Sequence, residues 1–133
     1  MQKKFLKKII AQSFEDLQII SAYCSQARVK VSDIKFLPSN KIFLISLSRF
    51  EKKNNNFMKK KFISSIIKFE YIESSKSKNI NQNQGSLELE LLTIDILKKD
   101  TKYEIILLFS KNRFITLTTE IIEVTLEDQK YTK

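Results

Sequence analysis

The sequence predicts an α+β fold that is mostly antiparallel β, with one N-terminal helix and about seven to eight strands in a bent sheet or partly open barrel. Three observations indicate this class. A helical apolar stripe occurs once, near the N-terminus, and from Arg28 onward apolar residues recur at every second position. The later apolar runs are separated by short polar connections typical of hairpins. So many strands in one flat sheet would leave apolar faces in water, so the sheet is expected to bend.

The helix is expected from Ser13 to about Ser25. Ser13 can accept a hydrogen bond from the Asp16 amide, which is the arrangement of a helix N-cap. The apolar stripe consists of Phe14, Leu17, Ile20, Ser21 and Cys24. Its width predicts a helix that packs on one mouth or face of the sheet. The preceding stretch, Lys4 to Ala11, is interpreted as an opening edge strand, with a basic membrane-surface helix as the less favoured alternative.

The other elements follow from the period of two. The expected strands are Val29–Ile34, Lys35–Leu37, Lys41–Phe50, Phe62–Glu73, Leu87–Leu97, Tyr103–Phe109, Arg113–Thr118 and Glu120–Leu126. The strand at Lys41–Phe50 is apolar on both faces, which predicts a central position in the sheet. Residues 74–86 have little to bury and predict a mobile loop, and a short frayed tail is expected at 129–133.

Length and composition limit the class of protein. A chain of 133 residues supports one core, so a single domain over residues 1–133 is expected. One cysteine cannot form an internal disulfide, and the N-terminus lacks a signal-peptide pattern, so a cytoplasmic location is expected. No apolar stretch approaches the roughly 20 residues that span a bilayer, so no integral membrane association is expected. The net charge is +9, but all basic residues except Arg28, Arg49 and Arg113 are lysines, the usual solvated surface cations. The charge alone therefore does not indicate a nucleic-acid partner.

The residue types available exclude most catalytic templates. The chain has no histidine, which removes Ser-His-Asp and Cys-His sites and the commonest metal ligand. Cys24 falls on the apolar stripe and is expected in the core. Glu88 and Glu90 share one face of a strand, and Glu120, Glu123, Glu127 and Asp128 cluster near the end, which leaves a hard-cation or paired-carboxylate site as the alternative interpretation. The favoured interpretation is the wet face of an antiparallel strand, because the first two carboxylates alternate with leucines. No catalytic residue, cofactor or metal site is predicted.

Arg49 is the most informative single side chain. It extends the apolar row of Phe43, Ile45 and Leu47, where an aliphatic residue would be expected. A charge at the end of a buried row usually has a partner. Two interpretations remain open: an anion anchor at the barrel mouth, and an internal ion pair or solvent-reaching strand end, which is favoured.

A lysine-rich segment provides the candidate nucleic-acid contacts. They are Lys52, Lys53, Lys59, Lys60 and Lys61, with Phe57 and Phe62 close enough to stack on bases. Three hypotheses follow in order of preference. The first is a non-enzymatic interaction module, bound to a protein partner or to itself through a sheet edge or the helix-covered mouth. The second is a nucleic-acid or anionic-surface binder, and the third a small-anion or enzyme role around Arg49.

Several segments together resemble a known family. They are Asp16–Ala22, Leu37-Pro38, Ile42–Phe50, Ile121-Ile122 and Leu126-Glu127-Asp128. The chain resembles a family of small uncharacterised alphaproteobacterial proteins that is described only as a domain of unknown function. The resemblance runs from about Lys4 to Asp128. It implies a bacterial cytosolic protein, encoded near genes for peptidoglycan-precursor and histidine synthesis, and it carries over no catalytic residue.

Overall fold

The computed structural model describes residues 6–51 and 61–132, and within them the chain forms one α-helix, one short 3-10 helix and ten strands. All strand pairs are antiparallel, in the order β1-β10-β5-β4-β2-β7-β8-β9-β6, with β3 also paired to β4. The elements are β1 (Lys8–Ala11), α1 (Phe14–Tyr23), β2 (Ala27–Lys30), η2 (Val31–Asp33), β3 (Ile34–Leu37), β4 (Ile42–Glu51), β5 (Lys61–Phe69), β6 (Ile72–Lys78), β7 (Glu88–Lys99), β8 (Lys102–Phe109), β9 (Arg113–Thr119) and β10 (Val124–Thr132).

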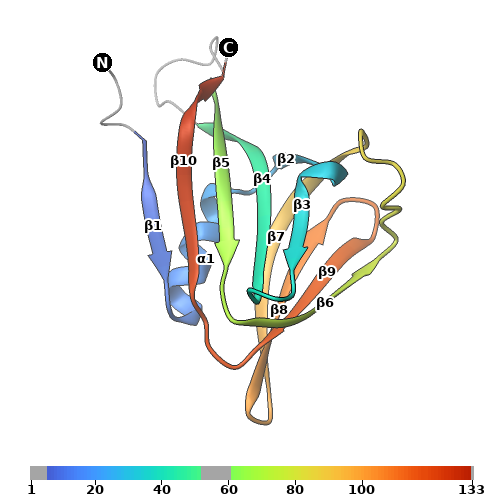
Figure 1. Ribbon diagram of the computed structural model, residues 1–133. Helices are drawn as coiled ribbons and strands as arrows, with labels where there is room; N and C mark the ends of the chain where they lie inside the picture. Colours follow the sequence, from blue (N-terminus) through green and yellow to red (C-terminus); the bar gives the residue numbers. More distant parts are fainter. Residues whose placement is uncertain (1–5, 52–60, 133) are drawn as a thin grey trace.

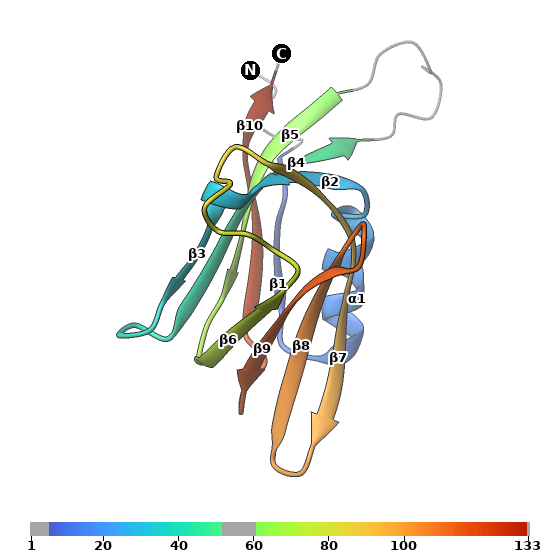
Figure 2. The ribbon, with the colours of Figure 1, turned by 90° about the vertical axis from the view of Figure 1, so that its right-hand side faces the viewer.

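The sheet folds back on itself into two layers (Figures 1 and 2). One layer contains β1, β10, β5, β4 and β3, and the other contains β7, β8, β9 and β6. The short strand β2 joins them, because it pairs with both β4 and β7. Helix α1 contacts β1 and β7 on one side of this arrangement, whereas β3 and β6 flank the other side. The sheet is therefore bent and not closed, as was predicted.

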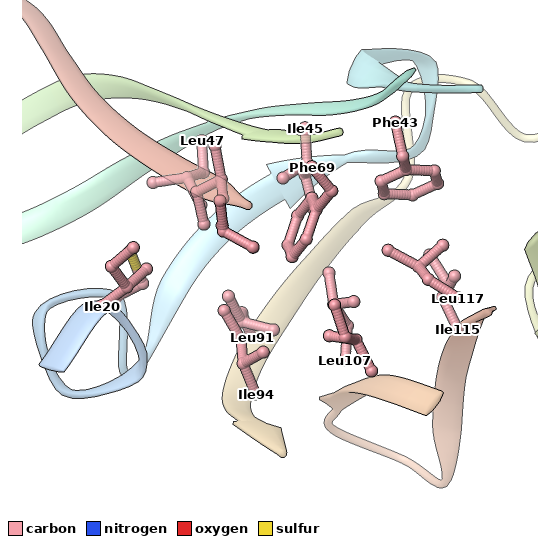
Figure 3. Packing of buried hydrophobic residues seen from close by; sticks show 14 of the residues in the cluster. Ile20, Phe43, Ile45, Leu47, Phe69, Leu91, Ile94, Leu107, Ile115 and Leu117 are labelled. Carbon is pink, nitrogen blue, oxygen red and sulfur yellow. The ribbon is translucent and has the colours of Figure 1, made fainter. Parts of the chain in front are cut away.

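The core fills the space between the layers (Figure 3). Phe43 and Phe69 meet edge to face from neighbouring strands, with ring centroids 5.8 Å apart. Ile94 and Leu107 approach from the opposite layer, and Ile20 enters from the helix. Alternation of buried and half-exposed residues along each strand produces this arrangement, since successive side chains point to opposite faces.

Helix α1 begins as predicted. Ser13 Oγ accepts a hydrogen bond from the Asp16 amide at 3.1 Å, which confirms the N-cap. Ser21 attaches the helix to β7, because its Oγ accepts from the Ile94 amide at 2.9 Å and lies 3.1 Å from Thr93 Oγ1. The helix thus covers the part of β7 that extends beyond its pairing with β2. No helix in the described part of the chain is long and apolar enough to cross a membrane.

The structure corrects three expectations. The strand count is ten rather than seven to eight. The expected strand Phe62–Glu73 ends at Phe69, and a separate strand, β6, runs from Ile72 into the predicted loop at 74–86, so that the connecting loop starts only at Asn79. β6 was missed because it is mostly serine and lysine and shows no apolar period. The expected frayed tail at 129–133 is, as far as Thr132, part of β10, paired with β5. Backbone pairing, with β9 for the first segment and with β5 for the second, holds both segments in the sheet.

Other expectations are confirmed. Strand β4 is central, with β5 on one side and β2 and β3 on the other. The two predicted hairpins, β7–β8 and β8–β9, are present.

The last strand does not pair with the strand that precedes it, since β10 pairs with β5 and β1 rather than with β9. This return places the C-terminal strand beside the N-terminal one.

Candidate functional site

Arg49 is the largest of the fully buried side chains in the described part of the chain. It lies at the end of the inward row of β4. Its Nε and Nη2 donate hydrogen bonds to the two carboxylate oxygens of Asp128 on β10, at 2.9 and 2.7 Å. Both side chains are almost completely excluded from solvent. This is the internal ion pair that the sequence analysis favoured.

Two further groups complete the environment of Asp128. Ser65 Oγ donates to Oδ1 at 2.6 Å from β5, and the backbone amide of Lys7 donates to Oδ2 at 2.9 Å. Burial acts to raise the pKa of Asp128, but the hydrogen bonds from Arg49, Ser65 and Lys7 outweigh it, and the pKa lies below its ordinary value. The carboxylate therefore remains charged and satisfied inside the fold.

A pocket of about 410 Å³ opens beside this pair, lined by Arg49, Lys7, Tyr23 and Phe50 among others. The guanidinium carbon of Arg49 lies 5.3 Å from the centre of the Tyr23 ring, and Lys7 Nζ lies 5.2 Å from it. One carboxylate already accepts two hydrogen bonds from the guanidinium. The geometry thus supports a structural role for Arg49 better than the anion anchor.

The remaining titratable candidates show no catalytic arrangement. Cys24 is completely buried, and burial raises the pKa of its thiol to about 12, so that no thiolate forms near neutral pH. Glu88 and Glu90 are exposed on β7, as expected for a wet face. Among residues 6–51 and 61–132 no group of three or more acidic, cysteine or histidine side chains could hold a metal ion.

Most of the lysine-rich candidate site lies outside the described residues: Lys52, Lys53, Phe57, Lys59 and Lys60. Lys61 begins β5, opposite Glu51. The Phe62 ring lies 5.9 Å from that of Phe50 and 5.5 Å from the guanidinium carbon of Arg28.

A groove of about 520 Å³ collects two of the chain's three arginines, Arg28 and Arg113. Lys111 also lines it, but so do Glu88 and Glu90. Its charge is mixed, because glutamates of β7 lie opposite basic residues of β2. No local pattern predicts that Arg28 and Arg113 lie together, since they lie on strands β2 and β9.

A different cleft lies where the two layers fail to join. It lies between β3 and β6 and has a volume of about 380 Å³. Ile34 and Phe36 line it from β3, and Ser75 and Ser77 line it from β6. Its floor is the core itself, formed by Phe43 and Ile115, which Figure 3 shows at the end of the core opposite Ile20. We call this cleft, between β3 and β6, the seam.

Hydrogen bonds define both ends of the seam. At one end the Ile72 amide donates to the Lys41 carbonyl at 2.8 Å, which joins the start of β6 to the β3–β4 turn. At the other end the Ser32 amide donates to the Gly85 carbonyl at 3.0 Å, so that the loop after β6 is attached to η2. Between these ends, β3 pairs only with β4 and β6 only with β9 among the strands that the structure describes. The seam therefore has a strand edge on each side and a fixed length.

Sequence patterns did not indicate this site. Most of β6 falls in the predicted loop at 74–86, because the inward positions of β6 are Ser75 and Ser77 rather than apolar residues. A weak signal was available, since Ser75–Lys78 alternates serine with lysine. Such alternation is typical of an edge strand facing a partly wet cleft.

A family model described as "Protein of unknown function (DUF2948)" matches residues 7–133. The chain belongs to this family. The match extends from the residue before β1 to the end of the chain, so the ion pair and the seam both lie within the DUF2948 region. It confirms the family of unknown function indicated by the sequence motifs. Comparison with curated proteins gave no match, and comparison with solved structures gave none.

Proposed function

We propose that the protein is a non-enzymatic, cytoplasmic bacterial interaction module that binds an extended segment of a partner protein at the seam. The observation that supports this is the pair of strand edges, β3 and β6, facing each other over an apolar floor. A strand edge presents a row of backbone N–H and C=O groups that another chain can pair with. Partner segments commonly bind in this way, with backbone hydrogen bonds for affinity and pockets for alternate side chains.

The lining of the seam suits a peptide better than a reaction. Ile34, Phe36 and Phe43 provide apolar contact, and Ser75 and Ser77 provide hydroxyl groups. Such side chains can position an extended chain but supply neither a general base near neutral pH nor an activated nucleophile. The cytoplasmic assignment continues the expectation from the single cysteine.

A blocking variant tests the proposal. Ser77 is exposed and lines the seam, so Ser77→Trp places an indole where the segment would lie. The matched control is Ser39→Trp, in the exposed turn between β3 and β4. Peptides selected from a random display library against the wild-type protein are then titrated against both variants.

We expect selected peptides to lose at least tenfold in affinity for Ser77→Trp and to keep it for Ser39→Trp. Hydrogen exchange should slow in β3 and β6 when a peptide binds. Equal binding to both variants, or protection elsewhere in the sheet, would refute the seam as the site. Light scattering after gel filtration covers the other occupant: a dimer that Ser77→Trp dissociates would mean that a second copy, and not a partner segment, fills the seam.

A second candidate function, binding of nucleic acid or an anionic surface, has one favourable observation. Arg28 lies over the Phe62 ring and shares a groove with Arg113 and Lys111. Its test is the affinity for single-stranded RNA as salt rises, with Arg113→Gln as the variant. Phosphate contacts predict a steep fall in affinity with salt and a shallower one for Arg113→Gln. Salt-independent binding would exclude this function.

A further inference from the structure

Next to the seam, the chain itself already pairs one strand with the edge of the sheet. Strand β7 pairs with β2 along the register Arg28 to Glu90 and Lys30 to Glu88. The side chains on the other face of this pair, including Val29 and its partner Leu89, are buried in the core. Here a basic strand edge is covered by a segment that alternates leucine with glutamate.

Strand β3 continues β2 after the single 3-10 turn η2, and both pair with β4. On the edge away from β4, β2 is covered by β7, whereas β3 faces the seam. The pattern of β3 repeats that of β2: Ile34 and Phe36 line the seam, and Lys35 between them is exposed. The uncovered half thus shares the inward apolar row and one exposed cation with the covered half, and differs at Leu37, which is exposed where β2 has Lys30.

The opposite wall of the seam has the same charge. Ser75 and Ser77 of β6 point into the seam, and the alternate residues Lys76 and Lys78 are exposed. The acidic side chains nearby are fewer: Asp33 lies in η2, and Glu73 is bound by Lys102 at 2.8 Å. The exposed charged residues of the two seam strands, here called the rim, are therefore Lys35 on β3 and Lys76 and Lys78 on β6, apart from the paired Glu73.

We infer that the segment bound at the seam is acidic and amphipathic, with apolar side chains alternating with glutamate or aspartate. This inference rests on the proposed function and adds the chemistry of the partner. A strand beside β3 turns every second side chain onto the floor of Phe43 and Ile115. The intervening side chains then emerge beside Lys35, Lys76 and Lys78, where carboxylates form favourable cross-strand pairs.

Synthetic peptides test the charge and the period separately. The probe is a fluorescent nine-residue peptide that alternates leucine and glutamate, as the chain itself does at Leu87–Leu91. Three comparison peptides replace every glutamate by glutamine, replace every glutamate by lysine, or keep the composition while grouping the leucines together. Affinity is measured by fluorescence anisotropy, and hydrogen exchange locates the bound peptide.

On the protein side, the double variant Lys35→Glu with Lys76→Glu reverses the rim, and Ser77→Trp blocks the seam. Lys98→Glu with Lys130→Glu is the control, because both lysines are exposed and lie outside the seam lining, on β7 and β10. It changes the net charge equally.

We expect the alternating glutamate peptide to bind most tightly and the lysine peptide most weakly. The glutamine peptide should bind about two- to fivefold more weakly than the glutamate peptide for each cross-strand pair that is lost. Rim reversal should weaken the glutamate peptide at least tenfold and strengthen the lysine peptide, whereas the control should change neither by more than about threefold.

The outcomes separate the inference from the proposed function. If glutamine and glutamate peptides bind equally and Ser77→Trp abolishes both, strand addition stands and the acidic partner is refuted. If the peptide with grouped leucines binds as tightly as the alternating one, the bound segment is not an extended strand with alternating side chains, and that part of the inference is refuted too. If no peptide protects β3 and β6 at any charge, the seam does not bind a strand and the proposed function itself fails.

Discussion

Arg49 and Asp128 meet inside the molecule as a bidentate pair, with Nε and Nη2 of the guanidinium 2.9 and 2.7 Å from the two carboxylate oxygens. Their strands, β4 and β10, are not neighbours, because β5 lies between them. Ser65 on β5 donates to the same carboxylate at 2.6 Å. Three adjacent strands thus contribute one polar group each to a single network, and 79 residues separate its two charges along the chain.

Removing one member of the pair should strongly destabilise the protein. Asp128→Ala leaves the Arg49 charge buried without its carboxylate, which costs about 3–5 kcal/mol in the free energy of unfolding. The measurement is urea denaturation followed by circular dichroism. As a control, Glu73→Ala removes the exposed pair with Lys102 and should cost less than about 1 kcal/mol.

The double variant Arg49→Met with Asp128→Leu distinguishes an unpaired charge from loss of packing. It should recover most of the stability lost in Asp128→Ala, because apolar residues of similar volume need no partner. A double variant as unstable as Asp128→Ala would contradict this account and indicate that shape, rather than charge, governs the site.

Acid should weaken the protein through the same carboxyl. The pKa of Asp128 in the folded state lies below its unfolded value of about 3.9, so the unfolded state takes up the proton first as pH falls. The contribution is complete above about pH 5 and is lost as pH falls through the folded pKa. Urea midpoints between pH 7 and pH 2.5 should therefore fall more for the wild type than for Arg49→Met with Asp128→Leu. Parallel curves would show that other carboxyls control the acid transition.

The thiol of Cys24 should be unreactive until the protein unfolds. It is completely buried, and burial raises its pKa to about 12. With an aromatic disulfide reagent at pH 8, we expect no labelling of the native protein over an hour and stoichiometric labelling in urea. Ser25→Cys, at the exposed position next to it, provides a reactive control and should label within minutes. Rapid labelling of native Cys24 would mean that helix α1 opens locally.

The N-cap of α1 offers a small, well-defined effect. Ser13→Ala removes the acceptor of the Asp16 amide and should cost about 1 kcal/mol, within the 0.5–2 kcal/mol range of such caps. Ser13→Gly should cost only a few tenths, since glycine is also tolerated at this position. Thermal unfolding compares the two. Equal losses would show that the cap hydrogen bond contributes little.

Local patterns were sufficient for much of the fold. The helix, its N-cap, the central strand β4 and the two hairpins could all be predicted, because each depends on residues close together in the sequence. Strand β6 could not, since its stability comes from backbone pairing with β9 and not from an apolar face of its own. The tail was missed for the same reason, because pairing with β5 holds it.

Arg49 shows where the limit lies. Its position at the end of an apolar row was enough to predict a buried charge with a partner. Ser65 and Asp128 also interrupt or extend apolar rows on their own strands, but only strand register brings the three together. Asp128 lies opposite Ser65, and Arg49 lies opposite Ile63, two positions away along β5. The identity of the partner therefore required the order β4-β5-β10.

The sequence by itself determined the fold class, the helix, most of the strands, the buried thiol and the absence of histidine chemistry, because side-chain period and residue type act locally. Only the tertiary structure decided which strands neighbour one another, since pairing energies depend on contacts between distant segments. That order made Asp128 the partner of Arg49 and separated β3 from β6. The seam exists because β2 pairs on both edges, whereas its continuation β3 pairs on one.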